Sequence, residues 1–154
     1  MALYQFTTVW EVEAPPEAVW DAIYFSLNWP KWWKDVISVD ELVEGNEDGI
    51  GSIRRYVLKS PMFYKLSFDL KLTHNTKYQF LSGTVSGQLS GVGSWAFTQE
   101  GVITKATCIW HVSTQLKWMH RLNFLLAPIF RYNHKLVMEH GLIGLKNFLL
   151  QKSK

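Results

Sequence analysis

A run of strand-like segments, followed by one long segment with helical periodicity, constrains the fold of this chain most. The strand-like segments cover roughly residues 51–59, 63–74, 77–86, 90–99 and 103–115, with turn residues between them. Strands joined by such short turns pair antiparallel. From Trp118 onward, apolar residues recur with a period of 3.6 instead of alternating. The chain is therefore expected to form an antiparallel sheet followed by one long helix.

The N-terminal part adds a further strand and two short helices. Residues 3–12 alternate with period two, which is typical of a strand with one buried face. Residues 14–27 are expected to form a helix, because Pro15 and Pro16 suit a first turn whose N–H groups have no partner. The chain breaks at Trp29-Pro30, and a second short helix (30–36) and a strand (37–43) are expected to follow.

The C-terminal helix is predicted over about 128–151, with Pro128 separating it from a short lead-in. On a helical wheel its apolar residues fall within roughly 100°. They are Ala127, Phe130, His134, Val137, Met138, Gly141, Leu145 and Phe148. Arg131, Lys135, Glu139 and Lys146 share the opposite side. The apolar stripe is therefore expected to lie on the sheet.

This order of elements predicts an α+β fold in a single domain over residues 1–154. A curled, seven-stranded antiparallel sheet would hold the long C-terminal helix against its concave face. The two short helices after the first strand would close one end. A curled sheet and one helix leave an apolar cavity unless every inward residue is large, and such cavities hold small apolar ligands.

Several segments resemble the START-like helix-grip superfamily, also called SRPBCC. They are "EAPPEAVWDAI" (13–23) and the Trp-Pro-x-Trp-Trp segment at 29–33. Within it the chain is most similar to the polyketide cyclase/dehydrase and lipid-transport-like branch. That closer resemblance is carried by "GIGSIRRYV" (49–57), "SGQLSGVGSW" (86–95) and "NHKLVMEHGLIGL" (133–145). The resemblance implies a cavity for sterols, lipids, polyketides or hormones. It implies no universal catalytic residue, since only some members are enzymes.

Charge and composition exclude several classes of function. The formal net charge is +3 and the basic residues are scattered, so a nucleic-acid partner, which needs a clustered basic patch, is not expected. The acidic residues between Asp40 and Asp48 are expected to form a solvated edge. Neither a metal-binding spacing nor a cofactor motif is present, and His134 and His140 lie on different helix faces. We therefore expect no metal and no cofactor.

The expected location is the cytoplasm. Cys108 is the only cysteine, the N-terminus lacks the pattern of a signal peptide, and no run of 18 apolar residues is present. The nearest approach to such a run, residues 122–130, is short and contains Pro128. Nothing in the pattern specifies an oligomeric state.

His134 is the one polar residue in the middle of the apolar stripe of the C-terminal helix. Three interpretations remain open. Its ring is a core group with a protein hydrogen-bond partner, a ligand contact in the cavity, or an acid–base group. Asn133 is expected on the flank of the stripe, where its side chain would cap or brace His134.

Arg54 and Arg55 are neighbours in a predicted strand, so one of them should face inward. Alternation does not decide which, because Tyr56 and Val57 are both apolar neighbours. A buried arginine needs an anionic or carbonyl partner. In one interpretation that partner is the carboxylate or carbonyl of a ligand. In the other, the inward arginine extends to the cavity mouth or pairs with an acidic residue of the protein.

Aromatic residues on the more apolar face of each strand are candidate walls of the cavity or plain core. The predicted ligand-contacting set is Trp10, Arg54, Arg55, Tyr56, Phe68, Trp95, Trp110, His134 and Met138. Trp20, Trp29, Trp32 and Trp33 in the short helices are interpreted as packing, or as a lid over the opening.

Three functions compete on this basis. The chain is a carrier or sensor of an apolar small molecule such as a lipid or polyketide. Alternatively, it is an enzyme of the cyclase or dehydratase type, in which His134 or the inward arginine polarises a carbonyl or moves a proton. In the third, residues 118–130 contact a membrane surface or a protein partner.

Overall fold

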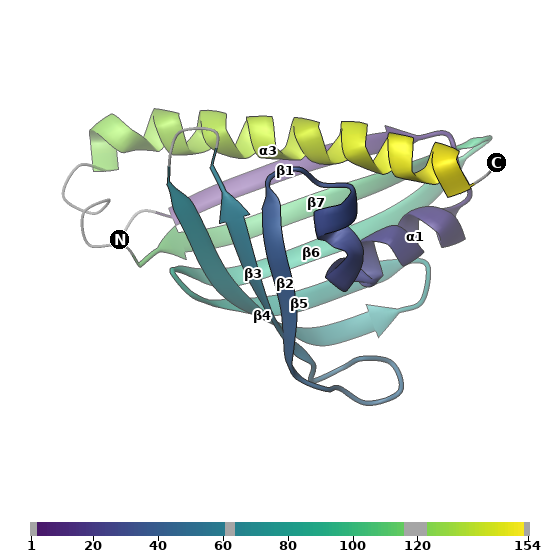
Figure 1. The fold of residues 1–154 in the computed structure, drawn as a ribbon, viewed down its shortest axis with the longest axis horizontal. Helices are drawn as coiled ribbons and strands as arrows, with labels where there is room; N and C mark the ends of the chain where they lie inside the picture. The colour runs from purple at the N-terminus through teal and green to yellow at the C-terminus, as the bar shows by residue number, and fades with distance from the viewer. Residues whose placement is uncertain (1–2, 61–63, 116–122, 153–154) are drawn as a thin grey trace.

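A single antiparallel sheet of seven strands dominates the computed structural model, which describes residues 3–60, 64–115 and 123–152 (Figure 1). The strand order is β1-β7-β6-β5-β4-β3-β2, so β1 and β2 are the two edges. The strands are β1 (Leu3–Val12), β2 (Val36–Val43), β3 (Ile53–Lys59), β4 (Lys65–Thr76), β5 (Phe80–Gly87), β6 (Leu89–Glu100) and β7 (Ile103–Thr114). Every pairing is antiparallel, as the short turns predict.

The long C-terminal helix, α3 (Asn123–Lys152), lies along one side of the curled sheet (Figure 1). It begins five residues before the predicted start at Pro128, so the predicted break at that proline is wrong. Pro128 sits in the second turn of the helix, where its missing N–H removes a single backbone hydrogen bond. The helix continues through it.

The two short helices also differ from prediction in their bounds. Helix α1 (Pro16–Tyr24) begins at the prolines, as expected, but ends before residue 27. The second, η1 (Ser26–Lys31), is a 3₁₀ helix that contains Trp29-Pro30 instead of following it. The tighter 3₁₀ turn explains the difference, because a proline in so short a helix removes few of its hydrogen bonds.

Two glycines of α3 let the Trp32-Trp33 segment approach the helix closely. A side chain at Gly144 would overlap the carbonyl oxygen of Trp32, and one at Gly141 would meet the rings of Trp33 and Trp10. The indole N–H of Trp33 donates to the carbonyl oxygen of Val137 at 2.9 Å. The segment after η1 is thereby fixed to the helix, and it closes one end of the space between helix and sheet.

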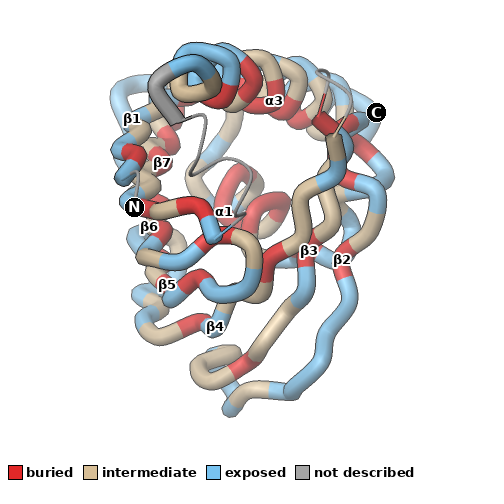
Figure 2. The backbone as a smooth tube through the Cα atoms, turned by 90° about the vertical axis from the view of Figure 1, so that its left-hand side faces the viewer, coloured by how far each residue is buried: buried red, intermediate tan, exposed pale blue. Residues whose placement is uncertain are grey.

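The buried face of α3 is the predicted stripe. Phe130, Val137, Met138, Gly141 and Leu145 are buried, whereas the residues predicted on the opposite side are exposed. Figure 2 shows the buried positions of α3 turned toward the sheet and exposed positions along its outer side. The concave face of the sheet and this stripe therefore bound the interior.

Candidate functional site

The interior between sheet and helix contains two neighbouring cavities. The smaller measures about 80 Å³ and is lined by Arg54, Tyr56, three serines (Ser52, Ser82 and Ser94) and mostly apolar residues; we call it the Arg54 cavity. The larger measures about 100 Å³ and includes His134, Asn133 and Met138 in its wall; we call it the His134 cavity. Each is smaller than the roughly 300–1,000 Å³ of pockets that hold drug-sized ligands.

Four aromatic side chains belong to the walls of both cavities and stand between them. This aromatic partition consists of Trp29, Phe68, Trp95 and Trp110. Phe68 meets Trp110 edge to face at 5.3 Å between ring centroids. The two cavities are therefore separated by rings and by no charged group of the described residues.

Arg54 is the inward member of the arginine pair, which the sequence left undecided. Its Nη1 donates to the carbonyl oxygen of Tyr24 at 2.7 Å and to Oγ of Ser26 at 2.9 Å. Its Nε lies 3.4 Å from Oε1 of Glu41. The Tyr24 carbonyl is at the C-terminal end of α1, where helix carbonyls lack backbone partners, so Arg54 caps that helix.

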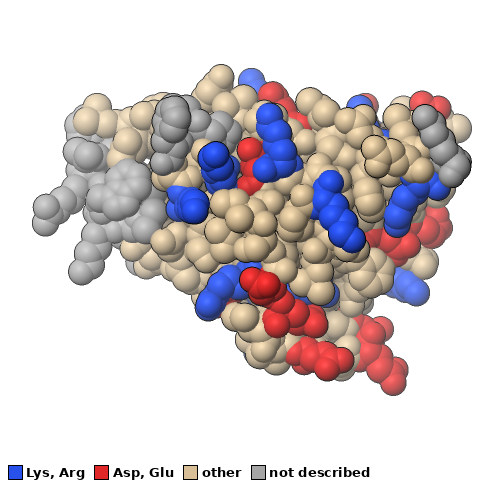
Figure 3. All heavy atoms as spheres, viewed as in Figure 1, with Lys and Arg blue, Asp and Glu red and all other residues tan. Residues whose placement is uncertain are grey.

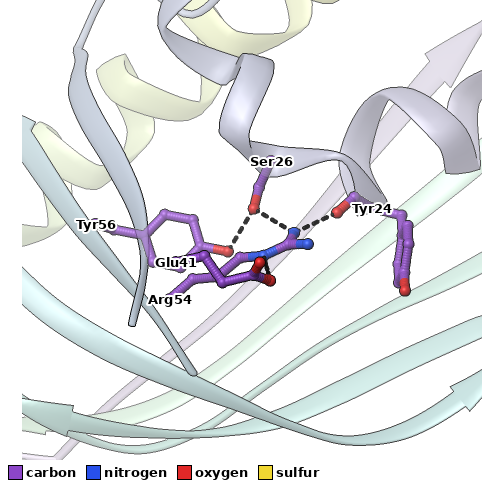
Figure 4. Close-up of polar contacts among 5 residues, drawn as sticks. All are labelled: Tyr24, Ser26, Glu41, Arg54 and Tyr56. Carbon is purple, nitrogen blue, oxygen red and sulfur yellow. Dashed lines mark hydrogen bonds and ion pairs between the residues drawn. The ribbon is translucent and has the colours of Figure 1, made fainter. Parts of the chain in front are cut away.

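Figure 4 shows the Arg54 guanidinium below Ser26, with its second terminal nitrogen outside the drawn contacts. No hydrogen bond of that nitrogen, Nη2, is measured among the described residues, although the guanidinium also interacts with the Tyr56 hydroxyl. A guanidinium carries five N–H donors, and two of them are on Nη2. Arg54 therefore retains donors for an oxygen of a ligand.

Tyr56 extends the same network inside the Arg54 cavity. Its hydroxyl lies 2.8 Å from Oγ of Ser26, which also accepts from Arg54 (Figure 4). Burial raises the pKa of the Tyr56 phenol, so the hydroxyl stays protonated. Arg54, Ser26 and Tyr56 form one connected polar group at the Arg54 cavity, whose wall also includes Ser52, Ser82 and Ser94.

Arg55 faces the other side of the sheet, because neighbouring strand residues point to opposite faces. Its Nε and Nη2 donate to the two carboxylate oxygens of Asp69 at 2.8 and 3.0 Å. This pairing raises the pKa of Arg55, and the side chain is half-exposed. The prediction that Arg55 contacts a ligand inside the cavity is therefore wrong.

His134 lines its cavity and stacks on Phe6, with ring centroids 3.9 Å apart and an interplanar angle of 8°. Burial lowers the pKa of the imidazole from 6.5 to about 4, so the ring is neutral near pH 7. No hydrogen bond from its ring to another described residue is found. Of the three open interpretations, the core group with a protein hydrogen-bond partner is therefore not supported within the described part of the chain.

Asn133 is buried, and it links α3 to the end of β3 instead of bracing His134. Its carboxamide oxygen accepts from the hydroxyl of Ser60 at 2.6 Å, and its nitrogen donates to the hydroxyl of Tyr64 at 3.1 Å. Burial raises the pKa of the Tyr64 phenol. This polar cluster forms one wall of the His134 cavity.

Trp10 is a core residue outside the walls of both cavities, contrary to its prediction as a ligand contact. Its ring packs against Trp33 and Trp95, at centroid distances of 5.3 and 5.0 Å, and against Gly141. The other predicted residues line one or both cavities. They are Arg54, Tyr56, Phe68, Trp95, Trp110, His134 and Met138.

Two larger hollows lie on the outside of the molecule. One, of about 1080 Å³, runs between α1 and the C-terminal end of α3, and its rim includes exposed charged residues such as Glu11 and Lys146. The other, of about 560 Å³, lies between β1 and α3. Their exposed charged rims make them poorer candidates for an apolar ligand than the two inner cavities.

The surface carries no clustered basic patch on the face drawn in Figure 3, where Lys and Arg side chains are spread singly. Acidic side chains gather at its lower end, around the β2–β3 turn, and Glu44, Glu47 and Asp48 are exposed there as predicted.

Within the described ranges, no group of three metal-ligating side chains is found and no helix is apolar and long enough to cross a bilayer. The segment predicted to touch a membrane, 118–130, lies partly outside the described residues.

Three contributors to the site were not predicted. Trp29 was interpreted as packing or a lid, but it lines both cavities. Ser26 and Ser60 carry no periodic signal, since each lies at the end of an element and reaches its partner only through the fold. A sequence signal existed only for Trp29, as part of the unusually aromatic segment 29–33.

Comparison with known proteins gives one family and one fold. A model of the family described as polyketide cyclase/dehydrase and lipid transport matches residues 4–147. No curated protein matches the chain. Among solved structures, protein TTHA0849 from Thermus thermophilus is similar with a TM-score of 0.83 and 18% identity, over 98% of this chain and 100% of that one.

Two further structures share the fold. The Zhui aromatase/cyclase from Streptomyces sp. R1128 has a TM-score of 0.81 and 11% identity, over 99% of this chain and 97% of its own. A START superfamily protein from Mycobacterium smegmatis has a TM-score of 0.76 and 14% identity, over 96% and 97%. At these identities the likeness extends to the helix-grip fold, as the sequence predicts, and not to a particular ligand.

Proposed function

This chain belongs to the polyketide cyclase/dehydrase and lipid transport family, and on this premise we propose that it binds an apolar small molecule between sheet and helix, as a carrier or sensor. The observation that carries the proposal is the aromatic partition of Trp29, Phe68, Trp95 and Trp110. Its rings present apolar faces to both cavities. Such rings stack on flat ligands and can turn to join the two spaces.

Cavity size sets the kind of ligand. Spaces of about 80 and 100 Å³ are each smaller than the roughly 150 Å³ that holds a benzene ring, so a molecule of one or two rings would have to span both spaces, with rings of the partition displaced. A longer polyketide or lipid requires rings of the partition to rotate. We therefore favour a small, flat, largely apolar ligand.

The polar groups set the ligand's chemistry. Arg54 offers guanidinium N–H donors from a largely apolar wall, and a carboxylate or carbonyl oxygen is the group that would accept them. On the other side of the partition, the neutral His134 offers a ring nitrogen to a hydroxyl or carbonyl. The proposed ligand is an aromatic or alicyclic molecule with an acidic or carbonyl group at the Arg54 end.

A matched pair of probes tests this proposal. Isothermal titration calorimetry would compare 2-naphthoic acid with its methyl ester, using wild type, Arg54→Gln and Arg55→Gln. We expect the acid to bind wild type and Arg55→Gln alike, and to bind Arg54→Gln at least about tenfold more weakly. The ester keeps a carbonyl oxygen but carries no charge, so Arg54→Gln should weaken its binding less than that of the acid, and Arg55→Gln should leave it unchanged.

Native mass spectrometry of the purified protein supplies an independent test. An apolar small molecule that copurifies with wild type would support the proposal. If no molecule copurifies and neither probe binds, the cavities are plain packing defects and the proposal fails. If the acid binds equally well to Arg54→Gln, a ligand site exists but its assignment to Arg54 is wrong.

A cyclase or dehydratase activity is the second candidate, and the neutral His134 favours it as a proton acceptor. Arg54 would stabilise the negative charge that develops on a carbonyl oxygen. The two groups line different cavities, however, so they would act on adjacent atoms only after the partition opens. Product analysis with a linear poly-β-keto thioester tests this candidate. Turnover lost in His134→Gln would favour it over carriage.

A further inference from the structure

The outer side of α3 carries a second apolar stripe that the fold leaves mostly exposed, with Leu136 as its one half-buried member. Ile129, Leu136, Ile143 and Leu150 follow one another at intervals of seven residues. Ile143 and Leu150 are 60% and 62% exposed, and Ile129 is 38% exposed. Leu125 and Tyr132, both more than half exposed, continue the same line toward the N-terminal end of the helix.

Helical geometry places this stripe opposite the core stripe. Seven residues make almost two turns of an α-helix, so residues at this interval lie in one row along it. The row is about half a turn away from Met138 and Leu145, which are buried. No other element covers this side of α3 in Figures 1 and 2, among the residues that the structure describes. An apolar row at heptad spacing is the pattern by which one helix packs against another.

The charged residues beside the row distinguish between a lipid surface and a second copy of this chain as its partner. Glu139 and Lys146 are exposed, are also seven residues apart, and lie along the same row between the apolar side chains. A lipid surface that took up the row would have to bury the Glu139 carboxylate beside its acyl chains, which is costly. A second copy of α3 running antiparallel brings Glu139 of each copy beside Lys146 of the other. The row is complementary to itself.

We propose that the outer face of α3 is a contact with a second copy of this chain, related by a two-fold axis near Ile143. In this arrangement Ile143 meets Ile143 of the second copy. Leu136 packs against Leu150 of the second copy, and Glu139 pairs with Lys146, each contact occurring twice. The contact uses the C-terminal half of the row. It leaves Arg54 and His134 on the other side of the helix, so pairing and ligand binding are separable.

Sedimentation velocity over a range of concentrations tests the contact on the full chain. Wild type should form a dimer, and Ile143→Asp should be monomeric. Val92→Asp is the matched control, because Val92 is an exposed apolar residue of β6 away from α3, and it should dimerise like wild type. Urea unfolding should show both variants folded, since neither side chain is buried.

Charge reversal identifies the proposed pairing. Glu139→Lys should raise the dimer dissociation constant about tenfold, and adding Lys146→Glu should restore it. A wild type that stays monomeric up to about 1 mM overturns the proposal. The proposal is also overturned if Ile143→Asp still forms the dimer. It is likewise overturned if adding Lys146→Glu to Glu139→Lys does not restore the dimer dissociation constant. Binding of wild type but not Ile143→Asp to vesicles of phosphatidylserine and phosphatidylcholine would assign the face to a lipid surface instead.

Discussion

His134 and Phe6 lie face to face, with their ring centroids 3.9 Å apart, and this stack joins the helix to the edge strand β1. The stack covers one face of the imidazole, and His134 lines the inner His134 cavity as well as the outer hollow between β1 and α3. A ring held in this way has lost most of its contact with water. The charged form of the imidazole is therefore disfavoured, and the stability of the folded protein is coupled to pH.

The first prediction concerns acid stability. Burial lowers the pKa of His134 to about 4 in the folded state, against about 6.5 when unfolded. Between these values the unfolded chain binds more protons, so stability falls as the pH falls from about 6.5 to about 4. The contribution of His134 to this loss is about 3 kcal/mol. Above about pH 6.5 it contributes no further change.

Urea unfolding at several pH values measures this contribution. His134→Phe keeps a ring on Phe6 but does not titrate, so its stability should depend less steeply on pH in that window. His111→Gln removes an exposed histidine and should follow the wild type. Equal slopes for wild type and His134→Phe would mean that the His134 ring is solvated.

The second prediction concerns the close approach of helix and tryptophan segment at Gly144. Alanine at an ordinary helix position stabilises by about 1 kcal/mol relative to glycine. At Gly144 its Cβ would overlap the Trp32 carbonyl oxygen, which is backbone and cannot rotate away. We expect Gly144→Ala to lower the free energy of unfolding by about 2 kcal/mol in urea. Asn147→Ala, at an exposed position of α3, should be neutral or slightly stabilising. A stabilised Gly144→Ala would contradict this packing.

Periodicity predicted the fold, because apolar alternation and the 3.6-residue repeat are properties of each segment alone. The stripe from Phe130 to Leu145 needed only the sequence. Periodicity did not predict which of Arg54 and Arg55 faces inward, because both faces of the strand at that point are partly apolar. Arg54 turns inward because the end of α1 and Ser26 provide its partners, and these come from a distant part of the chain.

The same limit explains the wrong prediction for Trp10 and the open question at His134. Both lie on correctly predicted inner faces, yet Trp10 is enclosed by Trp33 and Gly141 whereas His134 meets a cavity. The spacing of apolar residues predicts which face of a strand or helix a residue occupies. Whether a residue on that face meets empty space depends on the side chains brought opposite it.

The third prediction concerns Cys108, the only cysteine. Burial raises its pKa, and the thiolate is the form that reacts with disulfide reagents. Near pH 8 the native protein should react with Ellman's reagent about 100-fold more slowly than the urea-unfolded chain. Cys108→Ser has no thiol, so it should release no coloured thiolate from Ellman's reagent, whether native or unfolded in urea. Rapid reaction of the native protein would mean that the interior opens often enough to expose the thiol.

The fourth prediction separates the structural role of Arg54 from its role toward a ligand. Arg54→Ala removes the bonds to the Tyr24 carbonyl and to Ser26, and should cost about 1–3 kcal/mol of stability. Arg55→Ala removes an exposed ion pair with Asp69 and should change stability little.

Thermal unfolding with and without 2-naphthoic acid supplies the second readout. If the donors of Nη2 bind the acid, it should raise the Tm of Arg55→Ala as it does that of wild type, and leave the Tm of Arg54→Ala unchanged. If Arg54 only caps α1, the acid will shift all three proteins equally or none of them.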